Sequence, residues 1–217
     1  MKKIESSVLA RHYGYPFARA QLDFANSAKD IKILLLDVDG VLTDGGMLFD
    51  GGGESAKRFN VLDGFGLKLI QQAGIQPIVV TGSANGLVAP RLRVLGVDRA
   101  YYEVKDKLRV VDSILGTMGL SWANVASIGD DWPDLPSICL SAISAAPSTA
   151  HPELIRHARY VTRSAGGQGC VREFCDLILS ARGQYSLYLD EMMVRIEEYK
   201  KSSGSLGSQA THLDAVA

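Results

Sequence analysis

From residue 31 onward the sequence alternates short apolar runs with longer stretches of helical periodicity, and this alternation restricts the fold more than any other feature. Strands that alternate with helices form a mostly parallel sheet with helices on both faces. Right-handed crossovers place the carboxyl ends of such strands along one edge. We therefore predict a Rossmann-like α/β domain with strands at 31–36, 76–80, 99–102, 125–128, 142–146 and 160–162 and helices at 64–73, 87–95, 107–116, 133–139 and 170–181.

One insertion interrupts this order. Two short strand-like runs surround the glycine-rich turn 51–53, a pattern that predicts a β-hairpin flap and no large cap domain. Near the end, apolar residues recur at three- and four-residue spacing, which indicates an amphipathic helix whose stripe packs in the core or between subunits. The predicted organisation is an N-terminal extension 1–30, a main α/β domain 31–181 with its flap at about 45–61, a helix 182–202 and a Ser/Gly-rich, disordered tail 203–217.

Composition narrows the possible classes of protein. The 217 residues are 47% apolar and 22% charged, with a formal net charge of -1, so neither nucleic acid nor an anionic membrane surface is an expected partner. No segment approaches the roughly 20 apolar residues of a membrane span. The odd number of cysteines, Cys139, Cys170 and Cys175, argues against a disulfide framework. We expect a soluble, cytoplasmic protein.

Clusters of aspartates follow two of the predicted strands. Asp37 and Asp39 come directly after the first strand, and two like charges about 4 Å apart cost roughly 4 kcal/mol at an effective dielectric near 20. A second acidic cluster, Asp130, Asp131 and Asp134, follows the strand at 125–128. Oxygen ligands of this kind suit Mg²⁺, which would offset the repulsion. The sequence therefore predicts a magnesium site at the carboxyl edge of the sheet.

Two further strand ends carry groups suited to phosphate. Thr81 and Gly82 offer a hydroxyl and an approachable N–H, and Lys107 offers a positive charge. A carboxylate beside Mg²⁺ can attack phosphorus and form an aspartyl phosphate, while such neighbours neutralise and position the phosphoryl group. Each feature alone is common in turns and at helix starts, but four of them at four strand ends indicate phosphoryl transfer.

The motifs at these strand ends resemble a known family. "LLLDVDGVLTDG", the Thr-Gly pair, the helix opened by Lys107 and "IGDDWPDLP" resemble the four motifs of the haloacid dehalogenase (HAD) superfamily of phosphatases. The blocks "FNVLDGFGLKLI" and "VTRSAGGQGCVREFCDLIL" narrow the resemblance to the 3-deoxy-D-manno-octulosonate 8-phosphate (KDO 8-phosphate) phosphatases, which are capless and assemble as tetramers. The resemblance covers about residues 31–181.

This resemblance implies an activity and a set of roles. Asp37 would be the nucleophile, and Asp39 the general acid/base, with its backbone carbonyl on Mg²⁺. Asp130 would be the third metal ligand, supported by Asp131 and Asp134. The implied reaction is hydrolysis of a small phosphorylated sugar acid, such as KDO 8-phosphate in lipopolysaccharide biosynthesis.

The resemblance also implies phosphate ligands and an assembly. Thr81, Gly82 and Lys107 would hold the transferring phosphoryl group. The expected assembly is a homotetramer in which flaps pair with neighbouring flaps. A segment of a neighbouring subunit with Gly166, Gly167 and Arg172 would approach the active site.

The sequence departs from the family at three positions. Leu62, Ser83 and Gln168 stand where the family often has Arg. Arg suits the bidentate grip of carboxylate or phosphate, and each charge-assisted hydrogen bond contributes about 1.5–3 kcal/mol. A related nonulosonate phosphate or another small phosphorylated sugar is therefore an alternative substrate. Arg58 and Arg93 are unusual additions that either face the pocket or lie on the surface.

Two other functions compete with an active phosphatase. A phospho-accepting receiver domain places its acidic pair on the first strand and its acceptor on the third, unlike the D-x-D motif and later acidic cluster found here. A catalytically weak or silent HAD-like domain could serve assembly or binding in a sugar-nucleotide pathway. The missing arginines favour this silent-domain alternative, and the presence of Asp37, Asp39 and Asp130 opposes it.

Overall fold

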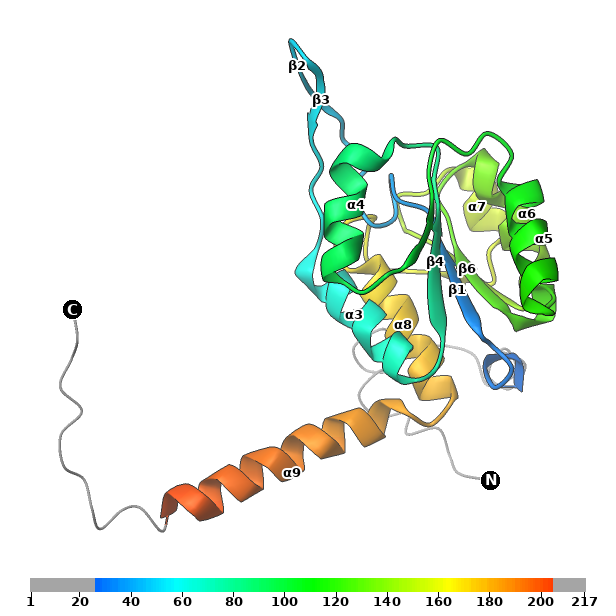
Figure 1. Ribbon diagram of the computed structural model, residues 1–217. Helices are drawn as coiled ribbons and strands as arrows, with labels where there is room; N and C mark the ends of the chain where they lie inside the picture. Colours follow the sequence, from blue (N-terminus) through cyan, green and yellow to red (C-terminus); the bar gives the residue numbers. More distant parts are fainter. Residues whose placement is uncertain (1–25, 205–217) are drawn as a thin grey trace.

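A six-stranded parallel sheet forms the centre of the computed structural model, which describes residues 26–204 (Figure 1). The strand order is β5-β4-β1-β6-β7-β8, which confirms the predicted α/β fold. In the central pairings, Ile33 lies opposite Gln76 of β4 and Val125 of β6. The strands are β1 (Ile33–Leu36), β4 (Gln76–Val80), β5 (Arg99–Tyr101), β6 (Val125–Ile128), β7 (Ile143–Ala146) and β8 (Tyr160–Val161).

The central strand β1 is buried on both faces. Leu34 and Leu36 pack into one apolar cluster, and Ile33 and Leu35 pack into a second cluster on the opposite face. Continuous apolar runs are typical of parallel strands because helices cover both sides of the sheet. Because β1 is packed on both faces, its carboxyl end is held in position, and the acidic motif begins there.

Helices cover the two faces separately. One face carries α3 (Val61–Gln72), α4 (Asn85–Val94) and α8 (Cys170–Ala181), and the other carries α5 (Lys107–Met118), α6 (Leu135–Leu140) and α7 (Pro152–His157) (Figure 1). Helix α7 was not predicted, because Leu154 is its one buried residue and a single buried position gives no helical repeat. Its start is marked by Pro152 and by the His151 side chain, which accepts a hydrogen bond from the backbone N–H of Glu153.

The predicted flap is present as an antiparallel hairpin of β2 (Leu48–Asp50) and β3 (Gly53–Ala56). It projects beyond the carboxyl edge of the sheet (Figure 1). The Asp50 carboxylate accepts a 2.8 Å hydrogen bond from the N–H of Gly52, and Gly53 adopts a φ of 120° that favours glycine. These local features stabilise the turn between β2 and β3.

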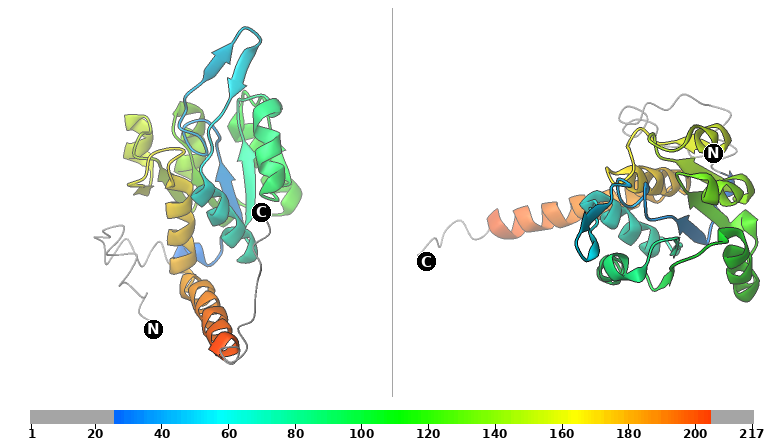
Figure 2. Two further views of the ribbon diagram at one scale, coloured as in Figure 1. Left: turned by 90° about the vertical axis from the view of Figure 1, so that its left-hand side faces the viewer. Right: turned by 90° about the horizontal axis from the view of Figure 1, so that it is seen from above.

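The C-terminal helix α9 (Tyr185–Gly204) extends away from the body of the domain (Figure 2). Tyr185 and Tyr188 pack against the main core, whereas Leu189, Ile196 and Tyr199 are exposed. Most of the apolar stripe therefore lies outside the core of the chain. Within 26–204, no helix combines the length and apolar character needed to cross a membrane. The predicted extension up to residue 25 and the tail from 205 lie outside the described residues.

Helices α3 and α8 are joined by a buried carboxylate. Helix α8 starts after Gly169, which has no side chain to cap the free N–H groups. Asp63 of α3 fills this role, because its two carboxylate oxygens accept hydrogen bonds from the N–H groups of Gly169 at 3.2 Å and of Arg172 at 2.8 Å. Asp63 is 1% exposed, so water cannot replace it easily.

We expect Asp63→Ala to lower the free energy of unfolding by about 2–6 kcal/mol, since two donors lose their acceptor and each unsatisfied buried donor costs about 1–3 kcal/mol. Asp63→Asn retains one acceptor oxygen and should cost about half as much. Urea denaturation measures both losses, with Asp98→Ala, at an exposed aspartate, as the neutral control. Equal stabilities of the Asp63→Ala and Asp98→Ala variants would contradict this role.

Candidate active site

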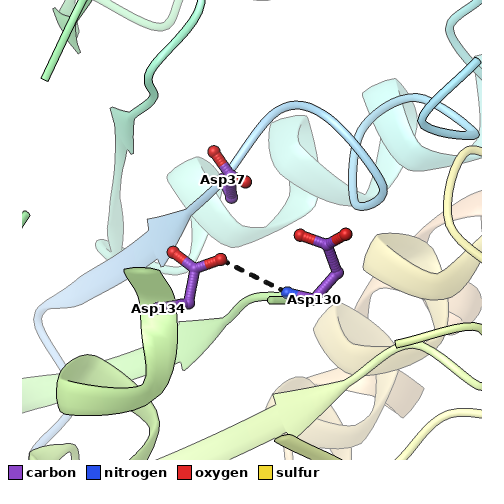
Figure 3. Close-up of side chains that lie close together, drawn as sticks. All are labelled: Asp37, Asp130 and Asp134. Carbon is purple, nitrogen blue, oxygen red and sulfur yellow. Dashed lines mark hydrogen bonds between the residues drawn. The ribbon is translucent and has the colours of Figure 1, made fainter. Parts of the chain in front are cut away.

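Three carboxylates meet at the carboxyl edge of the sheet. Asp37 follows β1, Asp130 follows β6, and Asp134 lies in the short 3₁₀ helix η2 (Trp132–Asp134). One carboxylate oxygen from each residue lies within 4.8 Å of the other two (Figure 3). The structure therefore brings Asp37 together with two acids that lie more than 90 positions later in the chain.

Two glycines allow this close approach. A Cβ atom on Gly40 would lie 2.0 Å from Oδ2 of Asp130, and one on Gly129 would lie 2.3 Å from Cβ of Asp134. Any larger residue at these positions would displace the carboxylates. The glycine in "DVDG" and the one in "IGDD" are thus part of the geometry of the acidic cluster.

Lys107 faces the cluster from the start of α5. Its Nζ lies 2.9 Å from Oδ1 of Asp37 and donates a 2.8 Å hydrogen bond to Oδ1 of Asp134. Burial lowers the pKa of Lys107, but the carboxylates of Asp134 and Asp37 outweigh this effect and hold the pKa above its ordinary value. The lysine is therefore charged at neutral pH.

One ammonium does not balance the three carboxylates of this cluster, of which Asp37 and Asp134 are buried and Asp130 is half-buried. Burial and the charges of Asp37 and Asp134 raise the pKa of Asp130 to about 7. Burial and the charge of Asp37 raise the pKa of Asp134 to about 7 as well, and burial also raises the pKa of Asp37 against the opposing effect of Lys107. An excess of negative charge on an all-oxygen set of side chains fits a divalent cation such as Mg²⁺.

The Asp39 side chain lies outside this cluster and has its own partners. Its Oδ1 accepts hydrogen bonds from Lys57 at 2.7 Å and Thr43 at 3.3 Å, and its Oδ2 accepts one from the Ser83 hydroxyl. Burial raises the pKa of Asp39, but the hydrogen bonds from Lys57 and Ser83 outweigh burial and lower it. Asp39 is therefore ionised in this structure.

Lys57 is a site residue that sequence reasoning missed. It follows β3, its side chain is 1% exposed, and its Nζ lies 2.7 Å from both Asp39 and Glu54. The only signal was a cation directly after the hairpin. The arginines considered instead lie elsewhere: Arg58 is exposed and paired with Asp44, and Arg93 is exposed in the last turn of α4.

The phosphate-binding residues expected after β4 lie at the end of that strand. Thr81 is buried, its N–H donates to the carbonyl of Tyr101 at 2.9 Å, and its Oγ1 accepts from the N–H of Ser83 at 3.1 Å. Gly82 is exposed. Asp131 is also exposed, and its carboxylate accepts a 2.8 Å hydrogen bond from the N–H of Trp132 instead of joining the acidic cluster.

The glycines before α8 contact the acidic loop of their own chain. A Cβ on Gly166 would lie 1.9 Å from the carbonyl oxygen of Gly40, and the N–H of Gly167 donates to the carbonyl of Val41 at 2.9 Å. The neighbouring Gln168 is exposed. This segment thus supports the loop that carries Asp37.

Arg172 lies between α8 and α3 within the chain. Its Nε donates to Asp176 at 2.8 Å, and its guanidinium carbon lies 5.3 Å from the centre of the Phe65 ring. Leu62, which lies about one turn before Phe65 in α3, is exposed. A contribution of Arg172 to a neighbouring subunit stays a prediction.

Comparisons with known proteins agree with this geometry. No family model matches the chain. The chain is 41% identical over 162 residues to the 3-deoxy-D-manno-octulosonate 8-phosphate phosphatase KdsC of Escherichia coli K12, which covers 75% of this chain and 86% of that protein.

Solved structures show the same architecture. The KDO 8-phosphate phosphatase of Moraxella catarrhalis, in complex with magnesium, phosphate and KDO, has a TM-score of 0.76 at 31% identity and covers 78% of this chain and 98% of its own. The enzyme of Yersinia pestis has a TM-score of 0.73 at 39% identity, with 76% and 89% covered. With this identity and coverage, the chain belongs to the KDO 8-phosphate phosphatase family of the HAD superfamily.

Proposed function

We propose that this protein is a Mg²⁺-dependent phosphatase that hydrolyses a small phosphorylated sugar acid, such as KDO 8-phosphate or a related nonulosonate phosphate. The observation that carries the proposal is the largely buried cluster of Asp37, Asp130 and Asp134 with Lys107 beside it. The relative from Moraxella catarrhalis, with its magnesium, phosphate and KDO, supports the same metal and substrate class.

The acidic cluster would hold the cation. The carboxylates of Asp37 and Asp130 and the backbone carbonyl of Asp39 would bind Mg²⁺, while Asp134 aligns Lys107 and the N–H of Asp130 through its two oxygens. Bound Mg²⁺ would supply positive charge against the phosphoryl oxygens. Lys107, Thr81 and Gly82 would hold the same oxygens from the protein side.

The reaction would proceed through Asp37 and Asp39. A carboxylate oxygen of Asp37 attacks phosphorus, the bond from phosphorus to the sugar oxygen breaks, and a proton from Asp39 neutralises the leaving oxygen. Water then attacks the aspartyl phosphate, Asp39 takes the proton of that water, and inorganic phosphate leaves. The hydrogen bonds from Lys57 and Ser83 favour the ionised form of Asp39 that this second step uses. For the first step Asp39 must take up a proton from water before the leaving oxygen departs.

The proposed assembly is a cytoplasmic homotetramer joined through the hairpins. Met47, Leu48 and Phe49 are all exposed on or beside β2, and three adjacent exposed apolar side chains favour a protein contact there. Arg172 of one subunit would then lie near the active site of another. Light scattering after size exclusion would measure the number of chains.

We expect Asp37→Asn to lower Mg²⁺-dependent phosphate release by at least about a thousandfold, since removing a nucleophile disables the whole catalytic unit. The measurement is phosphate release from a panel of phosphorylated sugars and sugar acids. EDTA-treated wild-type protein should be equally inactive and should recover when Mg²⁺ is added. A folded wild-type protein that releases no phosphate from any substrate would favour the silent-domain alternative.

We expect Mg²⁺ to stabilise the wild-type protein by about 2.7 kcal/mol at a concentration about 100 times its Kd. Thermal unfolding with and without Mg²⁺ measures this gain. Asp130→Asn should abolish it, because one of the three clustered carboxylates is lost. Asp131→Asn is the matched control and should keep the stabilisation by Mg²⁺, because Asp131 lies outside the cluster. If Asp130→Asn kept the stabilisation and Asp131→Asn lost it, Asp130 would not be the metal ligand.

We expect Ser83→Arg to lower KM for acidic sugar phosphates by at least about tenfold, since one hydrogen bond to a charged group contributes about 1.5–3 kcal/mol. KM for neutral sugar phosphates should change less. Ser83→Ala serves as the control, because it removes the hydroxyl on Asp39 without adding a guanidinium. Equal effects of Ser83→Arg on acidic and neutral substrates would show that position 83 does not select the carboxylate.

A further inference from the structure

An exposed tryptophan lies on the loop that carries the metal-binding acids. Trp132 is 63% exposed and occupies the position between Asp131 and Pro133, in the short segment that links Asp130 to Asp134. Its Cα can be at most about 7 Å from that of Asp130, which is two residues away. Burying a large aromatic ring is energetically favourable. A solvent-exposed indole close to an active site therefore suggests that a ligand or partner covers it.

The indole is exposed but held in one orientation. Its Nε1–H donates a 3.1 Å hydrogen bond to Nδ1 of His151, and the two rings meet edge to face at 87° with their centres 5.6 Å apart. The Nδ1 of His151 also accepts from the N–H of Glu153 at 3.2 Å. His151 therefore carries its proton on Nε2 when neutral, and Nδ1 is kept as an acceptor.

His151 is in turn attached to the acidic cluster. Its backbone N–H donates a 2.8 Å hydrogen bond to the carbonyl of Asp130. The orientation of the indole is thus linked through two hydrogen bonds to the residue proposed to bind Mg²⁺. Fixing a side chain before a ligand arrives lowers the entropy lost on binding.

The second tryptophan provides an internal comparison. Trp122 precedes β6, so it lies at the amino end of the strand whose carboxyl end leads to Trp132. Its Nε1–H donates to Asp112 at 2.9 Å, and its ring packs against the second core cluster. One tryptophan is therefore part of the core packing, while the other projects at the edge that carries the site.

We propose that Trp132 is a specificity-determining residue whose indole face packs against the C–H face of the sugar part of the substrate, with His151 as its positioning residue. This inference rests on the proposed function. The negative face of an aromatic ring attracts the positive edges of C–H groups, and the contact buries apolar surface on both partners. Such a contact needs no substrate carboxylate, which suits a site that has Leu62, Ser83 and Gln168 in place of arginines.

Steady-state phosphate release tests the contact. Trp132→Ala should raise KM for KDO 8-phosphate about tenfold while kcat changes less than about twofold, and it should leave KM for glycerol 2-phosphate, which has no ring, unchanged. Trp122→Phe should change neither KM. Equal changes for both substrates, or no change for either, would overturn the inference. His151→Ala should give a smaller increase in KM for the sugar substrate alone.

A fluorescence titration separates this inference from the proposed function. In Trp122→Phe, Trp132 is the remaining tryptophan of the two in the chain, and added KDO, which has no phosphate, should change its emission in a saturable way. No change with KDO, while Mg²⁺-dependent phosphate release persists, would overturn the sugar contact and leave the phosphatase intact. A saturable change without any phosphate release would support the contact and reject the phosphatase. Emission that depends on protein concentration and not on KDO would assign Trp132 to a contact between subunits and overturn the inference.

Discussion

Repulsion among three carboxylates, two of them buried and one half-buried, is the constraint on which the site depends. Asp37, Asp130 and Asp134 share one ammonium, that of Lys107, and their pKa values are raised because burial and mutual repulsion disfavour the charged forms. A fold tolerates such a cluster only if its backbone is rigid. The central strands β1 and β6 provide that rigidity, since the chain on either side of them is packed.

The two acids of the D-x-D motif are held in opposite electrostatic environments. Asp37 lies in the anionic cluster, whereas Asp39 lies among donors supplied by Lys57, Ser83 and Thr43. A separation of two residues is enough to turn the side chains to different surroundings. This difference suits the proposed division of roles, in which Asp37 attacks phosphorus and Asp39 transfers protons to the leaving oxygen and from water. Lys57 also ties the base of the hairpin to Asp39, so the position of the flap and the state of that carboxylate are linked.

The positions at which the family resemblance leads us to expect arginine lie outside the acidic cluster. At one of them the Ser83 hydroxyl donates a hydrogen bond to Asp39, and at the other two Leu62 and Gln168 are exposed. These changes reduce the positive charge available to an acidic substrate without removing any group from the acidic cluster. Trp132 adds a neutral surface at the same edge. An altered substrate preference with the proposed phosphatase chemistry retained is the consequence that we infer.

The sequence by itself determined the α/β fold, the hairpin and the carboxyl edge at which Asp37, Thr81, Lys107 and Asp130 gather. Those results follow from periodicity and from the rule that parallel strands end on one side. Only the tertiary structure decided which side chains touch. It put Asp134 into the acidic cluster, turned Asp39 toward Lys57, formed α7 from six residues and directed α9 away from the core. The reason is that periodicity fixes the direction of an element, whereas contacts within a few ångströms depend on side-chain rotamers and on packing between residues far apart in the chain.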